Sequence, residues 1–249
     1  MLFHQLKTFW GTKIWSRKWL LLGIGLALFL TTFYTLWTLS RSRTFQLFGK
    51  LVARVETTQK VVALTFDDGP NPVGTDKILD ILARNQVKAT FCLTGAELTQ
   101  YPELGQKIVL AGHQVANHSF SHDWMVFKSQ AFIRDEVERT DALIRQAGYQ
   151  GEIFFRPPYG KKLFGLPYYL SQTGRTTLMW DIEPESFSGI EGNVQNIVDH
   201  VTTGVRPGSI ILLHVMYRGR EASMDSVEPI ITRLRAQGFR FVTVNEMVN

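Results

Sequence analysis

The chain has 249 residues, 45% of them hydrophobic, which is enough to bury one sizeable core. Its net charge of +5 is unevenly spread. Residues 1–60 carry nine Lys or Arg and one acidic residue, whereas residues 61–249 carry eighteen Lys or Arg and twenty-one acidic residues. The basic excess therefore lies beside an apolar segment and suits an anionic membrane surface, while the mildly acidic remainder argues against a nucleic-acid partner. The single cysteine, Cys92, excludes an intrachain disulfide.

The segment from Trp19 to Ser40 contains no charged residue and is rich in Leu, Phe, Ile and Ala. Its twenty-two residues would span about 33 Å as a helix, enough to cross a hydrocarbon core of about 30 Å. A cleaved signal peptide is one alternative, but its apolar region is usually shorter, and no small-residue cleavage site precedes Arg41. A core helix is another, but it should carry a polar face. We therefore expect an uncleaved transmembrane anchor over residues 19–40.

This anchor divides the rest of the chain into an N-terminus (residues 1–18), a juxtamembrane linker (residues 41–59) and a folded domain (residues 60–249). Four basic residues flank each side of the anchor, so the positive-inside rule nearly cancels. We expect a cytoplasmic N-terminus and a single-pass membrane protein whose domain lies outside the cytoplasm, and this orientation rests partly on the function that the motifs imply.

From Lys60 onward, short apolar runs alternate with amphipathic stretches, a pattern typical of parallel strands joined by helices. Helices are expected at residues 75–85, in a stretch that ends near Gly112, and at residues 129–147. Seven strands are expected, and this number favours closure into a barrel over an open sheet. The expected strands lie at residues 61–66, 88–94, 114–117, 154–155, 176–182, 209–215 and 240–244.

Polar side chains gather where these strands end, which is where active groups collect in parallel sheets and barrels. Three of the six histidines in the chain fall at such ends. In strand order, the polar residues at these ends are Asp67 and Asp68, His118 and His122, Arg156, Asp181 and Glu183, and His214.

Two histidines four residues apart, together with a carboxylate from another strand, form a plausible metal site. Imidazole nitrogens suit zinc and other first-row divalent ions, and three protein ligands leave positions open for water and substrate. The alternative is that His118 and His122 are ordinary turn residues and that Asp67 begins an Asx-turn. Yet the adjacent carboxylates of Asp67 and Asp68 repel each other, which favours a cation beside them.

Four short motifs resemble those of a known family. The run Thr65-Phe-Asp-Asp-Gly-Pro70 is similar to the first motif of the polysaccharide deacetylases, the NodB-homology domain of carbohydrate esterase family four. His118-Ser-Phe-Ser-His122 resembles the second motif, Arg156-Pro-Pro-Tyr-Gly160 the third and Ile211-Leu-Leu-His214 the fifth. The four occur in the family's order, and the resemblance implies a distorted (β/α) barrel.

The same resemblance implies roles for individual residues. It assigns Asp68, His118 and His122 to a divalent metal, which we expect to be zinc, with cobalt or another first-row ion as alternatives. Asp67 would be the general base, Arg156 would orient it, and His214 would be the general acid. A backbone N–H near Tyr159, in the third motif, is a candidate to stabilise the oxyanion, and the Tyr159 ring is the aromatic side chain that we expect to contact a sugar.

The fourth motif departs from the family pattern. Its usual Asp-x-x-Asp-Trp corresponds here to Glu183-Pro-Glu-Ser-Phe187, so Ser186 stands where the family has the carboxylate that tunes the histidine acid. If that charge is missing, His214 should lose its proton at lower pH. Glu183, Glu185 or Asp181 are the residues that would substitute for it.

The expected function is metal-dependent hydrolysis of acetyl groups from N-acetylated sugars of a cell-wall or extracellular polysaccharide, resembling peptidoglycan or chitin. Two alternatives remain: a catalytically impaired glycan-binding protein, for which the altered fourth motif would be a symptom, and a metal-dependent hydrolase of another non-peptide amide. The partners expected are therefore an acetylated glycan and a membrane. No feature of the sequence indicates the oligomeric state.

Overall fold

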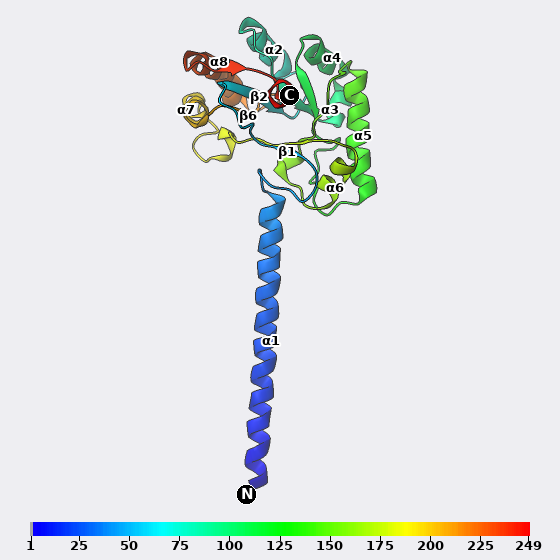
Figure 1. Cartoon of the computed structure of the whole chain (residues 1–249), viewed down its shortest axis with the longest axis vertical. Helices are drawn as coiled ribbons and strands as arrows, with labels where there is room; N and C mark the ends of the chain where they lie inside the picture. Colours follow the sequence, from blue (N-terminus) through cyan, green and yellow to red (C-terminus); the bar gives the residue numbers. More distant parts are fainter. Residues whose placement is uncertain (1) are drawn as a thin grey trace. The chain divides into compact units, whose positions relative to one another are not determined.

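The computed structural model describes residues 2–249, with side chains from Arg17 onward (Figure 1). The chain forms two compact units, divided between Arg41 and Ser42. The first unit is helix α1 (Leu2–Ser40), in which residues Arg17–Ser40 have a mean hydropathy of 1.9. This stretch is long and apolar enough to cross a membrane, although a signal sequence would share its length and composition.

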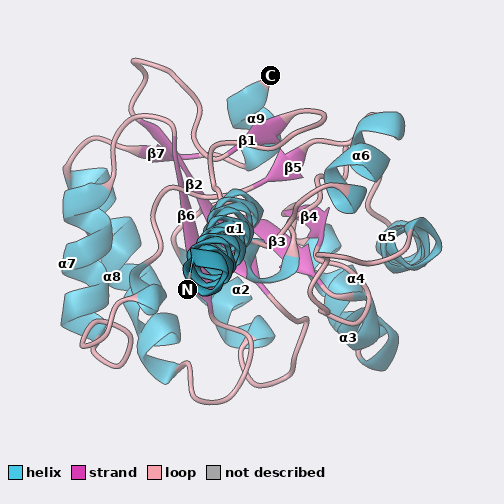
Figure 2. Cartoon of the chain, turned by 90° about the horizontal axis from the view of Figure 1, so that it is seen from below, coloured by secondary structure: helices cyan, strands magenta, loops and turns pink. Residues whose placement is uncertain are grey.

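The second unit is built on parallel strands (Figure 2). Its main sheet has the order β4-β3-β2-β6, with β7 also paired to β2, and a two-stranded sheet joins β1 and β5. The strands are β1 (Leu51–Val52), β2 (Val61–Asp67), β3 (Thr90–Leu93), β4 (Gln114–Asn117), β5 (Thr177–Leu178), β6 (Ser209–His214) and β7 (Arg240–Phe241).

Isolated bridges connect the two sheets into a ring. Phe155 bridges Asn117 at the end of β4 on one side and Thr177 of β5 on the other. Ile182, a few residues after β5, bridges Ile211 of β6. The resulting path through β6, β2, β3, β4, Phe155 and β5 returns to β6, which gives the distorted (β/α) barrel that the motifs implied. The strand expected at residues 154–155 is reduced to one residue, Phe155, which makes two isolated bridges.

Helices surround these strands (Figure 2). A large apolar cluster joins the outward face of the sheet to buried residues of the helices around it, among them Leu82 of α2, Val201 of α7 and Ile230 of α8. Besides the two 3-10 turns η1 (Pro158–Gly160) and η2 (Pro184–Ser186), the helices are α2 (Thr75–Arg84), α3 (Gly95–Gln100), α4 (Pro102–Leu110), α5 (Gln130–Gln146), α6 (Gly165–Gln172), α7 (Val194–Gly204), α8 (Glu221–Ala236) and α9 (Val244–Val248).

The alternation of side chains along each strand decides which residues face the interior of the ring. On β2, Val62, Leu64 and Phe66 belong to the outer cluster, whereas Ala63 belongs to a second, inner cluster. Counting by two from Ala63 leads to Asp67 at the carboxyl end of the strand. The same count leads from Ala116 to His118, from Phe154 to Arg156 and from Leu212 to His214, with all three starting residues in the inner cluster.

Residues 42–59, which the sequence predicted as a juxtamembrane linker, are part of this second compact unit. The Lys50 carbonyl accepts a hydrogen bond from Thr177 N at 2.9 Å, and Val52 O accepts one from Met179 N at 2.7 Å. Val55 N donates to Gly208 O at 3.0 Å. The folded unit therefore begins at Ser42. Its attachment to a membrane through the preceding segment stays a prediction.

Candidate active site

Asp68, His118 and His122 come together just beyond the carboxyl ends of β2 and β4. One possible ligand atom from each lies within 4.8 Å of those of the other two. His118 Nε2 lies 3.6 Å and His122 Nε2 3.3 Å from the same oxygen of Asp68, Oδ1. The structure therefore brings together the three residues that the sequence predicted as a metal site.

The two imidazole rings are in a form suited to metal binding. His118 Nδ1 lies 2.7 Å from the carbonyl oxygen of Arg156, which can only accept, so Nδ1 carries the proton and Nε2 is free to bind a cation. Burial and the neighbouring His118 lower the pKa of His122 to about 4, against the opposing effect of Asp68 and Asp67. Both nitrogen donors and the carboxylate thus fit a divalent first-row ion.

Asp67 is buried beside this group and is held by Arg156. The Arg156 guanidinium, which is fully buried, donates from Nη1 to Asp67 Oδ1 at 2.5 Å and to Thr65 Oγ1 at 2.8 Å. The second Asp67 oxygen, Oδ2, lies 3.6 Å from His118 Nε2. Burial raises the pKa of Asp67, but the charges of Arg156, His118 and His214 outweigh it and lower the pKa below its ordinary value. Asp67 is therefore an ionised carboxylate with one oxygen turned toward the three candidate ligands.

The backbone around the site is strained. Asp68, Ser119, His122 and Tyr159 all have positive φ, between 56° and 64°, a region that non-glycine residues rarely adopt. Glu136 of α5 stabilises the turn between the two histidines, because its Oε2 accepts from Phe120 N at 2.9 Å and from Ser121 N at 2.8 Å. Buried and on a long helix, Glu136 fixes this turn from behind.

Tyr159 lies at the open side of the site. The residue is 58% exposed, and the centroid of its ring lies 4.7 Å from that of His122 and 5.9 Å from that of Trp124. None of the described residues accepts a hydrogen bond from its backbone N–H, whereas the next N–H, of Gly160, donates to Pro157 O. This N–H is therefore available for a bound oxygen.

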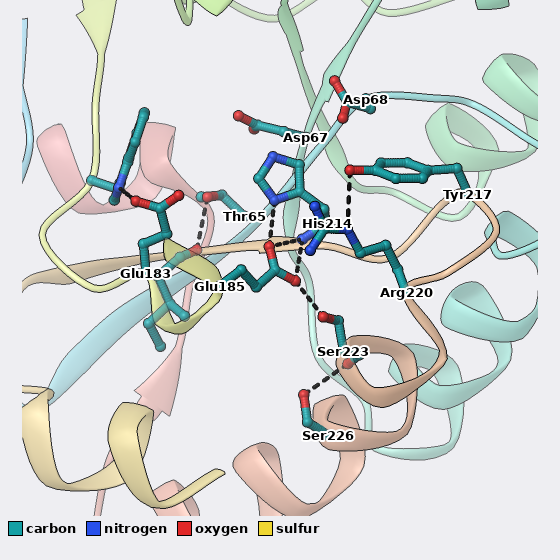
Figure 3. Close-up of polar contacts among 12 residues, drawn as sticks. Thr65, Asp67, Asp68, Glu183, Glu185, His214, Tyr217, Arg220, Ser223 and Ser226 are labelled. Atoms are coloured by element: carbon teal, nitrogen blue, oxygen red, sulfur yellow. Dashed lines mark hydrogen bonds and ion pairs between the residues drawn. The ribbon is translucent and has the colours of Figure 1, made fainter. Parts of the chain in front are cut away.

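His214, at the end of β6, pairs in register with Asp67 of β2. Its Nδ1 is hydrogen-bonded to Glu185, whose carboxylate also accepts from His214 N and from the Ser223 hydroxyl (Figure 3). Burial lowers the pKa of His214, but the hydrogen bond and charge of Glu185, with the charges of Asp67 and Asp68, raise it to about 9. The ring is therefore protonated at neutral pH, and its Nε2 has no hydrogen-bond partner among the residues that the structure describes.

Glu185 thus supplies the charge that the sequence left open in the fourth motif. Asp181 is used elsewhere, since it accepts from Ser209 Oγ and Ile210 N, both at 2.8 Å. Glu183 pairs with Arg43 at 2.7 Å. Ser186, the position where the family has its carboxylate, is exposed. The hypothesis of a missing charge with a lowered His214 pKa is therefore wrong, because a neighbouring carboxylate reaches the ring.

Sequence reasoning did not identify Glu136, and it named Glu185 only as one of three alternatives. Glu136 has a readable signal, since it is an acidic residue that falls on the same helical face as Ile133, Val137 and Thr140, all buried. The choice of Glu185 needed the path of the backbone through η2, which sequence spacing does not give.

Comparison with known proteins places this geometry in a family. The family model for polysaccharide deacetylases matches residues 54–178, and the chain therefore belongs to the polysaccharide deacetylase family. This is a family of hydrolases, and the relatives found by sequence are named as deacetylases of N-acetylated glycans.

One relative is the peptidoglycan-N-acetylmuramic acid deacetylase PdaC of Bacillus subtilis, 36% identical over 78% of this chain and 40% of that protein. This chain therefore spans less than half the length of that relative. The structure of a peptidoglycan N-acetylglucosamine deacetylase, Bc1960, matches with a TM-score of 0.75 and 30% identity, over 79% of this chain and 92% of that one. BA3943 of Bacillus anthracis, described as a pseudoenzyme of the same family, matches with a TM-score of 0.72 and 26% identity. The match covers 82% of this chain and 70% of that one.

Proposed function

We propose that this protein removes acetyl groups from N-acetylated sugars of a cell-wall polysaccharide, with peptidoglycan as its first candidate substrate. The observation that carries the proposal is the register pairing of Asp67 with His214 beside the three candidate metal ligands. An ionised carboxylate and a protonated imidazole are thereby fixed on adjacent strands. Hydrolysis of an amide needs such a pair, one group to take a proton from water and another to give one to the leaving nitrogen.

The donor set of Asp68, His118 and His122 fits zinc or a similar divalent ion, and we assign these three residues to hold it. Such a cation supplies a water of lowered pKa, near 7 in zinc enzymes, and a positive charge for the acetyl oxygen. The hydrogen bond from His118 Nδ1 to the Arg156 carbonyl orients the ring for this role.

The protein's own groups perform the proton transfers. Asp67 Oδ1 is occupied by Arg156, so Oδ2 is the oxygen that accepts a proton from the attacking water. The Tyr159 N–H lies free to donate to the oxyanion that forms at the acetyl carbonyl. His214, whose Nδ1 is held by Glu185, gives the proton on Nε2 to the departing sugar nitrogen. Products are acetate and a free amine on the sugar.

The direct test is a deacetylation assay on the full chain, loaded with zinc or cobalt, using purified peptidoglycan beside an acetylated chitooligosaccharide. Released acetate and new amines are measured together. Turnover of a glycan supports the proposal. Binding of glycan without acetate release would instead favour an impaired glycan-binding protein, an outcome that the likeness to BA3943 makes worth testing. Turnover of a small non-sugar amide alone would favour the second alternative, a metal-dependent hydrolase of another non-peptide amide.

We further propose that α1 remains attached as a single-pass membrane anchor, with the N-terminus in the cytoplasm and the domain outside it. The supporting features are the apolar stretch Arg17–Ser40 and the wall polymer named for the relatives. Cell fractionation, followed by protease treatment of spheroplasts, tests both parts. A soluble mature form that starts near Arg41 contradicts retention, and a protease-protected domain contradicts the orientation.

A further inference from the structure

The segment of residues 42–50, here called the strap, follows α1 directly and is tied to the folded domain. Lys162, only three residues after Tyr159, donates from Nζ to the carbonyl of Ser42. At the other end of the strap, Thr177 N donates to Lys50 O. The strap therefore runs from the segment just after the third motif to β5.

Within the strap, Arg43 makes a specific pair of contacts. Its Nη2 lies 2.7 Å from Glu183 Oε2, and its guanidinium carbon lies 4.9 Å from the centroid of the Trp180 ring. The same Glu183 oxygen accepts from Trp180 Nε1 at 2.8 Å. Trp180 is 6% exposed and Glu183 is 9% exposed, so the carboxylate and the indole are buried, whereas the Arg43 side chain, at 38%, is partly exposed.

Trp180 in turn supports two parts of the site. The guanidinium carbon of Arg156 lies 5.6 Å from the centroid of the Trp180 ring. The ring also packs closely on the turn after Tyr159, because a Cβ added at Gly160 would lie 3.0 Å from Trp180 Cη2. A shift of this indole would therefore reach both the arginine that holds Asp67 and the turn that presents the Tyr159 N–H.

We propose that Arg43 of the strap is a positioning residue for the deacetylation, which acts by holding Trp180 against Arg156 and the Tyr159–Gly160 turn. The inference rests on the proposed function and adds to it a residue outside the part of the chain that the family model matches, residues 54–178. It makes the segment next to the anchor part of the catalytic apparatus and not a mere tether.

The reason lies in what remains when Arg43 is removed. Glu183 would keep its buried charge with only the indole N–H to satisfy it, and burying an unpaired charge is costly. Relaxation of that carboxylate toward water would carry the Trp180 ring with it. Because small displacements of catalytic groups cost large factors in rate, we expect kcat to fall about tenfold.

The test compares three variants of the full metal-loaded chain. Arg43→Ala should lower kcat about tenfold while KM and metal content stay close to those of the parent. Arg43→Lys should recover part of the loss, since it restores the charge beside Glu183 but not the planar stacking on the ring. Arg54→Ala is the matched control: Arg54 is less exposed than Arg43, at 15% against 38%, and donates to Pro207 O away from the site. It should lower thermal stability and leave kcat unchanged.

Trp180→Phe gives an independent check on the route. It keeps an aromatic ring but removes the donor to Glu183. If Arg43 acts through Trp180, adding Arg43→Ala to Trp180→Phe should reduce kcat by much less than it does in the parent. Equal reductions in both backgrounds would overturn the proposed route.

The remaining outcomes are also decisive. A parent protein that turns over glycan, with an unchanged kcat in Arg43→Ala, overturns the positioning role and leaves the proposed function standing. A loss of kcat in Arg43→Ala that Arg54→Ala matches, at matched thermal stability, shows a merely structural effect and also overturns it. A parent protein without glycan turnover contradicts the proposed function itself.

Discussion

The two ends of the candidate site are built on different principles. At the end formed by β2 and β4, Asp68, His118 and His122 converge through backbone turns that hold residues at positive φ. At the end formed by β6 and η2, His214 is hydrogen-bonded to Glu185. This carboxylate lies one position before the one where the family pattern has it. The first end keeps sequences that resemble the family motifs, whereas the second departs from the family pattern in sequence and restores the contact in space.

This contrast reflects what each end requires. Three ligands must meet within a few ångströms with defined directions, so the residue and its backbone conformation are both constrained. A charge that tunes a histidine needs only to reach hydrogen-bonding distance of Nδ1. Glu185 has one more methylene than the aspartate of the motif, and it meets this need with support from the Ser223 hydroxyl. We therefore expect substitution to be tolerated at the second end and not at the first.

The largest effect should follow from breaking the first end. His118→Ala removes one of three ligands, so we expect loss of bound metal and a fall in kcat/KM of about a thousandfold or more. His113→Ala is the matched control, since His113 is also buried but flanks the opposite end of β4. It should cost stability and spare the metal. Metal content by elemental analysis, with activity before and after chelation, checks both. Full turnover in metal-free protein would refute the site.

The next largest effect should follow from His214→Ala, at the second end of the site. Without its acid, the leaving nitrogen must depart unprotonated, and we expect kcat to fall by roughly a hundredfold to ten-thousandfold. Bound metal should be unaffected, because His214 is not one of the three candidate ligands. A steady-state assay together with a metal determination measures this. Undiminished activity would remove His214 from the mechanism.

Glu185→Gln sharpens the comparison through the pH–rate profile. Glu185 helps to raise the pKa of His214 to about 9, and a general acid donates only while it is protonated, so the parent should lose activity as pH rises through this value. Removing the carboxylate charge lowers that pKa. The alkaline limb of kcat should therefore move down by about one pH unit or more. Profiles of both proteins, measured with saturating substrate, test this, and coincident alkaline limbs would contradict the role of Glu185.

Sequence reasoning succeeded where local pattern determines position. The apolar runs placed Asp67, His118, Arg156 and His214 at expected strand ends, and parallel pairing gathers such ends at one edge, as it does for Asp67 and His214. It could not place residues 42–59, because β1 is only two residues long and gains its order from partners more than a hundred residues away. Nor could it choose among the acidic residues near the fourth motif, since that depends on where η2 turns each side chain.

The smallest effect is expected from Ser186→Asp, which restores the family's residue at the position where this chain has lost it. Ser186 is exposed, and the His214 Nδ1 that an aspartate would have to reach is already bonded to Glu185. The added charge would lie in water, where its field is weak. We therefore expect the alkaline limb to stay within about 0.3 pH units of the parent. The informative protein is the double variant Glu185→Gln/Ser186→Asp. If only proximity to His214 Nδ1 matters, the double variant should keep the lowered alkaline limb of Glu185→Gln. Recovery of the parent profile would show instead that the turn at η2 can re-form around the family's aspartate, and that the two positions are interchangeable.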